Sequence, residues 1–327
     1  MKKFFFISFI FFTFCSAICA LDSKYLSFRI TPRFELTNGT INEYVFNEEC
    51  RNTDDKLSQL DWDVKTIPTF GIRADIDLLK YIYIGIDGSV GVPKKSGNMQ
   101  DYDWLNYKYW PKDDPTEITN YSIHENYLLK YMTFSVGGGV NIKLPAKITL
   151  TPMMFYYYDF FSFDGKYGYK TYKEDNWKKI NFSGMVISYK QEINDFLLGL
   201  AVRVETLPKA FFYADFLASP NNTNLNALDF HYINKNDGTG TAFWDNFSKI
   251  WQLQTHAKVQ YRFNKYHSAG LTASLQYIPL TKGNTRDKGI DKDGNIIREQ
   301  EWSAPQINGG GTSRLIWTLG VNYSFSL

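Results

Sequence analysis

Cysteine is scarce in this chain of 327 residues, and long apolar runs are missing beyond its first segment. The three cysteines are Cys15, Cys19 and Cys50. The first two lie in a stretch with the layout of a secretory signal, with a charged start at Met1-Lys2-Lys3, an apolar region and a small residue at Ala20. We expect residues 1–20 to be a signal peptide and Cys50 to be a loop thiol, so the processed chain contains no intrachain disulfide.

An excess of either charge is also missing. The chain has 36 Lys and Arg against 34 Asp and Glu, and residues 1–20 contain two lysines and no acid, so the processed chain is formally neutral. Neutrality argues against a general nucleic-acid-binding protein. The sequence has no Gly-rich phosphate loop, zinc-ligand spacing or Gly-x-Ser-x-Gly motif, and we expect no cofactor and no metal.

Aromatic residues are abundant, at 17% of the chain, and apolar residues alternate with polar ones. The alternation is clearest over 251–263, 269–277 and 317–327, where every second residue is apolar. A period of two is typical of β-strands with one apolar face and does not fit a helix. Outer-membrane barrels have this profile because lipid-facing residues alternate with polar lumen-facing ones.

Short links and long polar segments alternate between the predicted strands. Further strands are expected at 24–37, 41–49 with 56–77, 80–92, 124–143, 147–163, 184–205 and 210–219. Tight links are expected at 38–39, 78–79, 144–146 and 206–208, and long loops near 94–122, 164–180, 220–247 and 282–311. This layout predicts an all-β, transmembrane, antiparallel up-and-down β-barrel of about ten strands, with long extracellular loops and short periplasmic turns. Residues 21–327 are expected to form a single outer-membrane domain.

Two polar triplets end strand-like runs: Asp101-Tyr102-Asp103 and Asp229-Phe230-His231. Residues i and i+2 of a strand share a face, so Asp101 and Asp103 point the same way, as do Asp229 and His231. If the triplets meet across the barrel mouth, three carboxylates and an imidazole surround one small volume. Such a group can activate a water molecule for hydrolysis.

The chain resembles the omptins, a family of outer-membrane barrel endopeptidases. The residues that carry the resemblance are 58–62 (SQLDW), 97–104 (GNMQDYDW), 189–191 (YKQ), 229–232 (DFHY) and 282–285 (KGNT). The resemblance implies a ten-stranded barrel in the outer membrane of a Gram-negative-type bacterium, with a groove at its extracellular mouth.

The resemblance also implies catalytic roles. Asp229 orients and charges the imidazole of His231, which activates the attacking water. Asp101 holds that water with His231, and Asp103 gives electrostatic or proton-transfer support. We expect direct attack without an acyl-enzyme, because no Ser or Cys is recognised as a nucleophile in the sequence.

A polypeptide substrate with a basic residue before the cleaved bond is implied as well. Glu43 matches one acid of the family's pocket, and Met99 matches a methionine of the pocket wall. The second pocket acid is replaced by Ala227, and Ile233 stands where a further acid can tune the next subsite. We therefore expect a preference for basic residues that is less strict, with an apolar residue tolerated after the cut.

Outer-membrane lipid is the other partner that the resemblance implies, through basic residues that bind lipopolysaccharide. The matching positions are Phe160 and Glu192, so two expected cations are missing. The sequence leaves a dependence on lipopolysaccharide open.

The alternative function is a catalytically inactive barrel that acts as an adhesin or a narrow pore. The missing pocket acid, the altered lipid site and the long loops favour it. All four catalytic positions are nevertheless occupied by the required residue types, which favours the peptidase. Charged side chains in the lumen, such as Arg29, Arg33, Glu35 and Arg203, would also make a ten-stranded barrel conduct poorly.

Overall fold

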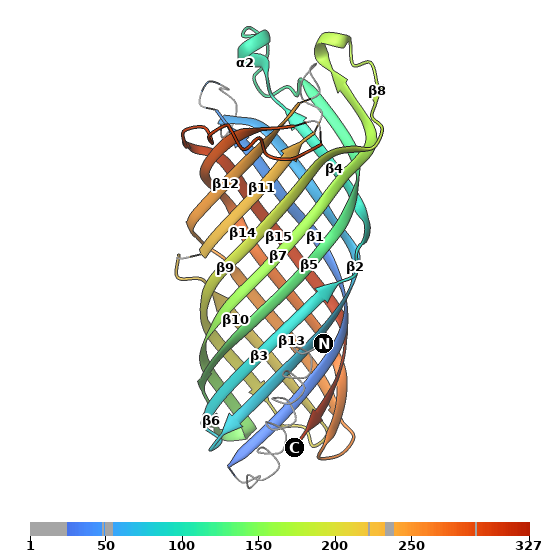
Figure 1. Ribbon diagram of the computed structural model, residues 1–327. Coiled ribbons are helices and arrows are strands. Elements are labelled where there is room, and N and C mark those ends of the chain that lie inside the picture. The colour runs from blue at the N-terminus through green and yellow to red at the C-terminus, as the bar shows by residue number, and fades with distance from the viewer. Residues whose placement is uncertain (1–24, 48, 50–54, 222, 233–238, 292) are drawn as a thin grey trace.

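The computed structural model describes residues 25–47, 49, 55–221, 223–232, 239–291 and 293–327 (Figure 1). The strands are β1 (Leu26–Phe46), β2 (Lys56–Leu78), β3 (Ile82–Gly91), β4 (Lys94–Asp103), β5 (Asn120–Val140), β6 (Ile142–Leu144), β7 (Ile148–Tyr172), β8 (Ile180–Asn181), β9 (Met185–Val204), β10 (Ala210–Ala218), β11 (Thr223–His231), β12 (Gly240–Ile250), β13 (Leu253–Arg262), β14 (His267–Ile290) and β15 (Gln306–Ser326). The short helical segments are α2 (Asn106–Tyr109), η3 (Pro145–Lys147) and η4 (Lys173–Asp175).

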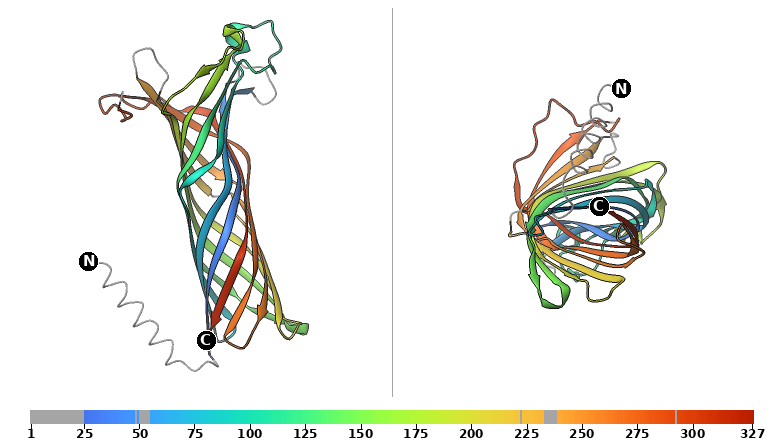
Figure 2. Two further views of the ribbon diagram at one scale, coloured as in Figure 1. Left: turned by 90° about the vertical axis from the view of Figure 1, so that its right-hand side faces the viewer. Right: turned by 90° about the horizontal axis from the view of Figure 1, so that it is seen from below.

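The strands form an antiparallel ring that closes between β15 and β1. Three ring positions are shared by two consecutive strands: β3 and β4 both lie between β2 and β5, β10 and β11 both pair with β9, and β12 and β13 both pair with β14. With β1, β2, β5, β7, β9, β14 and β15 this makes ten positions, and the view from below in Figure 2 shows the closed ring. The predicted barrel of about ten strands is confirmed.

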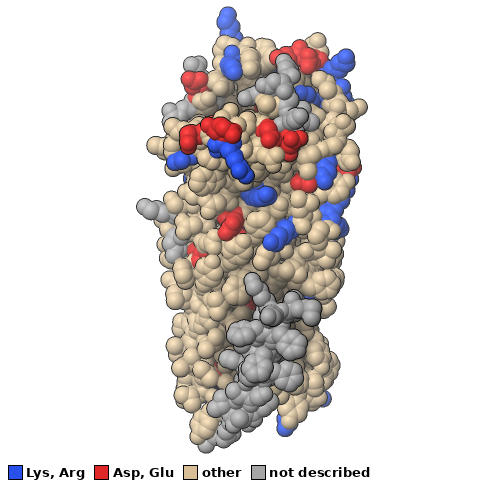
Figure 3. All heavy atoms as spheres, in the orientation of Figure 1, with Lys and Arg blue, Asp and Glu red and all other residues tan. Residues whose placement is uncertain are grey.

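Side-chain alternation divides each strand between lipid and lumen. Along β15, Leu315, Trp317, Leu319 and Val321 are 39–56% exposed, whereas Arg314, Thr318 and Asn322 between them are buried. An outward apolar band with polar lumen residues is the arrangement of a transmembrane barrel. Lys, Arg, Asp and Glu gather over the upper half of the face drawn in Figure 3, and few appear on its lower half. The lower half is therefore the membrane-facing part.

Short links join the strands at the lower end of the barrel, as predicted. Leu79 and Lys80 have positive φ angles of 51° and 65° in the link between β2 and β3, and η3 forms the link between β6 and β7. At the other end α2, β8 and the segment 293–305 that follows β14 extend beyond the ring (Figure 1). In Figure 2 the upper strands diverge into two groups, one containing β4, β5 and β8 and the other β12, β14 and β15.

The prediction of a turn at Asn38-Gly39 is wrong, because β1 continues through this dipeptide. The register to β2 shifts between Thr37 and Gly39, so the dipeptide is part of a β-bulge. Gly39 has a φ of 147°, and a Cβ there would lie 2.0 Å from the carbonyl oxygen of Leu315 on the neighbouring strand. Glycine is required at this position by the close approach of two strands rather than by a hairpin turn.

The strands also reach further into the predicted loops than expected. β4 and β11 lie within segments predicted as loops, most of β12 lies in one, and β14 continues to Ile290. Above the membrane the outer face of a strand meets water, so polar residues are acceptable on both faces and the apolar alternation weakens. The two polar triplets therefore lie on strand ends, Asp103 ending β4 and His231 ending β11.

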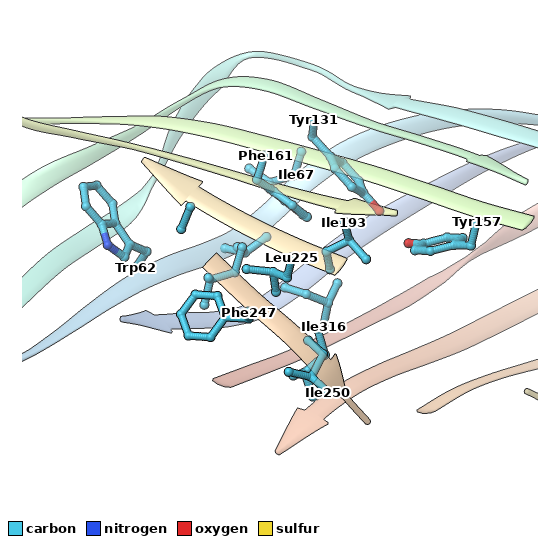
Figure 4. Packing of buried hydrophobic residues seen from close by; sticks show 14 of the residues in the cluster. Trp62, Ile67, Tyr131, Tyr157, Phe161, Ile193, Leu225, Phe247, Ile250 and Ile316 are labelled. Carbon is cyan, nitrogen blue, oxygen red and sulfur yellow. The ribbon is translucent and has the colours of Figure 1, made fainter. Parts of the chain in front are cut away.

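The upper lumen is filled by a cluster of buried apolar side chains. Trp62 stacks on Phe163 and Tyr189, with ring centroids 5.8 Å and 5.4 Å apart, and Phe161 stacks on Tyr131 at 4.2 Å. Figure 4 shows members of this cluster converging on the interior from several strands. The cluster closes the lumen below the mouth, so the mouth is a depression whose base is formed by packed side chains.

Several sequence-based expectations fall outside the described residues: the signal peptide at residues 1–20, Cys50 and Ile233. Among the described helices, none is long and apolar enough to span a membrane.

Candidate active site

The end of β4 presents two carboxylates on one face. Asp101 pairs with Leu60 on β2 and with Ser122 on β5, and Asp103 pairs with Ser58 and Asn120. Ser58 Oγ donates a hydrogen bond to Asp101 Oδ1 (3.1 Å), and Asn120 Nδ2 donates one to Asp103 Oδ2 (3.3 Å). The neighbouring strands thus hold both side chains with neutral donors rather than with cations.

The end of β11 presents the Asp–His pair. The Oδ2 atom of Asp229 is hydrogen-bonded to Nε2 of His231, and Asp229 is buried. The imidazole lies edge-on to the ring of Phe243, with centroids 5.3 Å apart, and its side chain is 25% exposed. An ionised carboxylate only accepts hydrogen bonds, so this contact places the proton on Nε2 and the lone pair on Nδ1.

The two triplets meet at one cavity of about 90 Å³ in the mouth. Asp101, Asp103 and Met99 line it from β4, His124 from β5 and His231 from β11. The carboxyl pair and the imidazole, 128 positions or more apart in the chain, therefore face the same space. Met99 pairs with Trp62 and His124 in the strand register and is buried in the wall.

The pKa values of His231, Asp101 and Asp103 are all raised in the mouth. Burial lowers the pKa of His231, but Asp229, Asp101 and Asp103 outweigh burial and raise that pKa overall. Burial and the charge of Asp103 raise the pKa of Asp101 well above its usual range, and burial raises the pKa of Asp103. The site thus favours a protonated imidazole and opposes the simultaneous ionisation of both β4 acids.

Glu43 lies beside this cavity, buried on β1. It pairs with Leu60 and Thr312 on the adjacent strands, and it is not among the residues that line the cavity. Burial and then the charges of Asp229, Asp245 and Asp101 raise the pKa of Glu43 well above its usual range. Glu43 therefore belongs to a second acidic group that shares Asp229 with the catalytic pair.

Asp245 was not recognised in the sequence, because its strand, β12, lies in a predicted loop. It is 4% exposed and stands opposite Ala227 in the register of β11 and β12. The pKa of Asp245 is raised to about 7, mainly by burial and also by the negative charge of Asp229. The hydrogen bond with Thr285 acts in the opposite direction. The signal that could have revealed it is the alternation Phe243-x-Asp245-x-Phe247, which places the acid on the same face as two aromatic residues.

Ser122 and His124 form a second polar pair in the cavity. Ser122 Oγ lies 2.9 Å from His124 Nε2, and His124 Nδ1 lies 2.6 Å from the carbonyl oxygen of Tyr167. A carbonyl oxygen only accepts, so Nδ1 carries the proton and Nε2 accepts from the serine. Ser122 therefore lies in the cavity beside a histidine whose pKa burial lowers.

The remaining sequence-predicted positions lie away from the cavity. His256 faces the lumen, where it is hydrogen-bonded to Asp215 (2.8 Å). Phe160 and Glu192 pair on β7 and β9 and line a groove of about 300 Å³ on the outer wall, together with Lys190, Trp244 and Trp302. Within the described residues no group of three or more His, Cys, Asp or Glu side chains is arranged to hold a metal ion.

A model of the omptin family matches residues 29–325. The chain belongs to the omptin family. Its fold is that of the outer membrane protease OmpT from Escherichia coli, with a TM-score of 0.80 at 18% identity over 92% of this chain and 97% of that one. It is also 30% identical over 100 residues to the plasminogen activator of Yersinia pestis, a match that covers 30% of this chain and 28% of that protein. The chain is an outer-membrane β-barrel of a Gram-negative bacterium.

Proposed function

We propose that this omptin is an outer-membrane endopeptidase that cleaves extracellular polypeptides by direct attack of water. The observation that carries the proposal is that Asp101, Asp103 and His231 line one cavity while Asp229 is hydrogen-bonded to the imidazole. Residues 21–327 act as one domain in this proposal, with the cavity facing the exterior.

His231 is the general base. Its neutral imidazole takes a proton from a water molecule held between it and Asp101, and the hydroxide attacks the carbonyl carbon of the substrate. Asp229 fixes the orientation of the ring and, with Asp103, stabilises the imidazolium that forms. The imidazolium then returns the proton to the leaving amine. Three carboxylates and an imidazole make this an acid–base site of aspartyl type, without a covalent intermediate.

A serine mechanism is the second candidate, because Ser122 Oγ is hydrogen-bonded to His124. We favour water attack for two reasons. Burial lowers the pKa of His124, which weakens it as a base, and its second partner is the neutral carbonyl of Tyr167 rather than a carboxylate. Direct attack predicts no burst of the first product in pre-steady-state cleavage, whereas an acyl-enzyme on Ser122 predicts a burst that matches the enzyme concentration.

The preferred substrate carries a basic residue before the cleaved bond, and Glu43 receives it. A buried acid that borders the catalytic pair is placed to attract a cation to the adjacent subsite. Glu43→Ala should lower the cleavage of an Arg peptide far more than that of a neutral peptide. An equal loss on both peptides would refute this role.

The decisive test is cleavage of a quenched peptide containing Arg-Arg or Arg-Lys by the chain refolded in detergent. Asp101→Ala and His231→Ala should each lower kcat/KM by about 10³-fold or more, since each removes a group that handles the attacking water. No cleavage by the wild-type chain, or cleavage by both variants at the wild-type rate, would favour the inactive adhesin instead. The narrow pore is disfavoured by the packed aromatic cluster that closes the lumen.

Lipopolysaccharide is proposed to be dispensable for activity. Phe160 and Glu192 offer an aromatic face and a negative charge at positions where a phosphate-binding cation was expected, although Lys130 lies over the ring of Phe160 at 5.2 Å. Cleavage that rises more than about tenfold on adding lipopolysaccharide would contradict this proposal.

A further inference from the structure

Three buried carboxylates on different strands share one small region beside the catalytic cavity: Glu43 on β1, Asp229 on β11 and Asp245 on β12. Their exposed fractions are 3%, 2% and 4%. Each has one oxygen without a hydrogen-bond partner among the described residues, namely Glu43 Oε2, Asp229 Oδ1 and Asp245 Oδ1. Buried acceptors are normally satisfied, and leaving one without a donor is costly.

The other oxygens of this group are engaged with neutral or catalytic partners. Asp229 uses Oδ2 for His231, and Thr285 is hydrogen-bonded to Asp245. Tyr189, fully buried against Trp62, lies within range of the charges of both Glu43 and Asp245, which contribute to raising its pKa. No ion pair involves Glu43 or Asp245 within the part of the chain that the structure describes. Besides the indole N–H of Trp62, which lies near Glu43, no donor among the described residues satisfies these three oxygens, so a bound cation can supply donors to them.

The backbone around Asp245 makes room for its side chain. A Cβ on Gly310 of β15 would lie 2.7 Å from Asp245 Oδ1 and 2.8 Å from its Cγ. Asp245 therefore lies over the glycine, on the lumen side of the wall, while its neighbours Trp244 and Asn246 are exposed on the opposite face. An ordinary side chain at 310 would displace the carboxylate.

We propose that Asp245 is a specificity-determining residue that, with Glu43, binds the basic side chain of the substrate before the cleaved bond. The inference rests on the proposed peptidase function and names a residue that the sequence did not reveal. A guanidinium is the ligand that fits best, because its planar array of N–H donors can bridge carboxylates that come from two strands. The ammonium of lysine has a single centre and should bind less tightly.

A cation bound in this region reduces the repulsion between the three carboxylates. The negative charges of Asp229 and Asp245 oppose the ionisation of Glu43, and a bound guanidinium removes that opposition. A neutral side chain of the same shape leaves the carboxylates unpaired, and sites of this kind discriminate strongly against such analogues. Citrulline, which has the shape of arginine without its charge, is the matched neutral probe.

The test compares peptides that differ only in Arg, Lys or citrulline before the cleaved bond, using the refolded full chain. Asp245→Asn should lower kcat/KM for the Arg peptide by at least about tenfold and leave the citrulline peptide within about twofold. Ala227→Asp, added to Asp245→Asn, should restore part of the Arg preference, because Ala227 is directly opposite on β11. Asn246→Asp adds a carboxylate at the adjacent outward position and should change neither peptide.

A binding experiment separates this inference from the proposed function. Uncleavable peptides with a reduced bond, carrying Arg or citrulline, are titrated into the wild-type chain and into Asp245→Asn. Tighter binding of the Arg peptide that is lost in Asp245→Asn supports the pocket even if no peptide is ever cleaved. An Arg-to-citrulline ratio that stays the same in the folded variant, in binding or in cleavage, overturns the proposal.

Discussion

The mouth and the lumen below it handle buried charge in opposite ways. In the lumen, Arg33 binds Asp87 through two contacts of 2.7 Å and Glu35 at 2.9 Å, and Arg314 binds Asp159 at 2.8 Å with both side chains fully buried. In the mouth, Asp101, Asp103 and Asp229 act on the imidazole of His231, and Glu43 and Asp245 lie within range of the charge of Asp229.

This difference separates the charges that stabilise the fold from those that belong to the proposed site. Paired lumen charges satisfy one another and hold the strands together across the barrel. The acids of the mouth repel one another and are held in place by the surrounding sheet. This arrangement lowers the stability of the fold but allows the site to bind a cation and to take up a proton. The following changes test this contrast, starting with the largest expected effect.

Arg314→Met should destabilise the barrel by about 3–5 kcal/mol, because it leaves the carboxylate of Asp159 buried without its partner. The measurement is urea unfolding of the refolded barrel in detergent, followed by tryptophan fluorescence. The double variant Arg314→Met with Asp159→Leu removes both charges and should recover most of the loss. A single variant within about 1 kcal/mol of wild type would show that the lumen pair is not structural.

Asp229→Asn should lower kcat/KM by about 10²–10⁴-fold and move the acid limb of its pH profile to lower pH. The neutral imidazole is the active form, and Asp229 is the largest influence that raises the pKa of His231 against burial. Without that charge the imidazole stays neutral at lower pH. The pH dependence of kcat/KM for an Arg peptide measures this.

The control for this pH profile is Asp113→Asn, which removes an exposed acid that is ion-paired with Lys173 and does not line the cavity. Its acid limb should coincide with that of the wild type. An acid limb that stays in place in Asp229→Asn, or moves to higher pH, would contradict the assignment of His231 as the base.

Glu43→Gln should stabilise the folded barrel by about 1–2 kcal/mol at neutral pH while lowering its preference for Arg. The folded pKa of Glu43 is raised, so the folded state binds a proton more tightly than the unfolded state does. Wild-type stability therefore falls as pH rises from the ordinary Glu range, and the advantage of Glu43→Gln should appear in the same range and vanish below it.

Urea midpoints of wild type and Glu43→Gln between pH 4 and pH 8 measure this effect. Glu117→Gln, which neutralises an exposed acid in the upper loops, is the matched control and should show no advantage that depends on pH. A stability difference that is constant over this range, or that reverses, would mean that Glu43 is not under repulsion.

Much of the site could be predicted because its residues occur in short triplets on strand ends. The i, i+2 spacing of Asp101 with Asp103 and of Asp229 with His231 places each pair on one face, and the resemblance to omptins assigned their roles. Asp245 could not be found in this way, because it stands alone in a segment where apolar alternation is weak.

At Asn38-Gly39 the local sequence predicts a structure that the tertiary fold overrides. Asn-Gly is a strong turn signal by itself, yet here the strand continues, since β15 approaches so closely that only glycine fits. Ser122 and His124 are two positions apart on β5 and contact each other directly, whereas the carbonyl of Tyr167, from β7, decides which ring nitrogen of His124 carries the proton.

The sequence by itself determined the strand period, the membrane-facing apolar faces and the face that each polar triplet shares, because these depend on neighbours one or two positions apart. The tertiary structure alone decided which acids meet. Closing a ring of tilted strands brings β1, β4, β11 and β12 to one mouth, and the register across those strands sets Asp245 opposite Ala227 and joins it to Glu43 and Asp229.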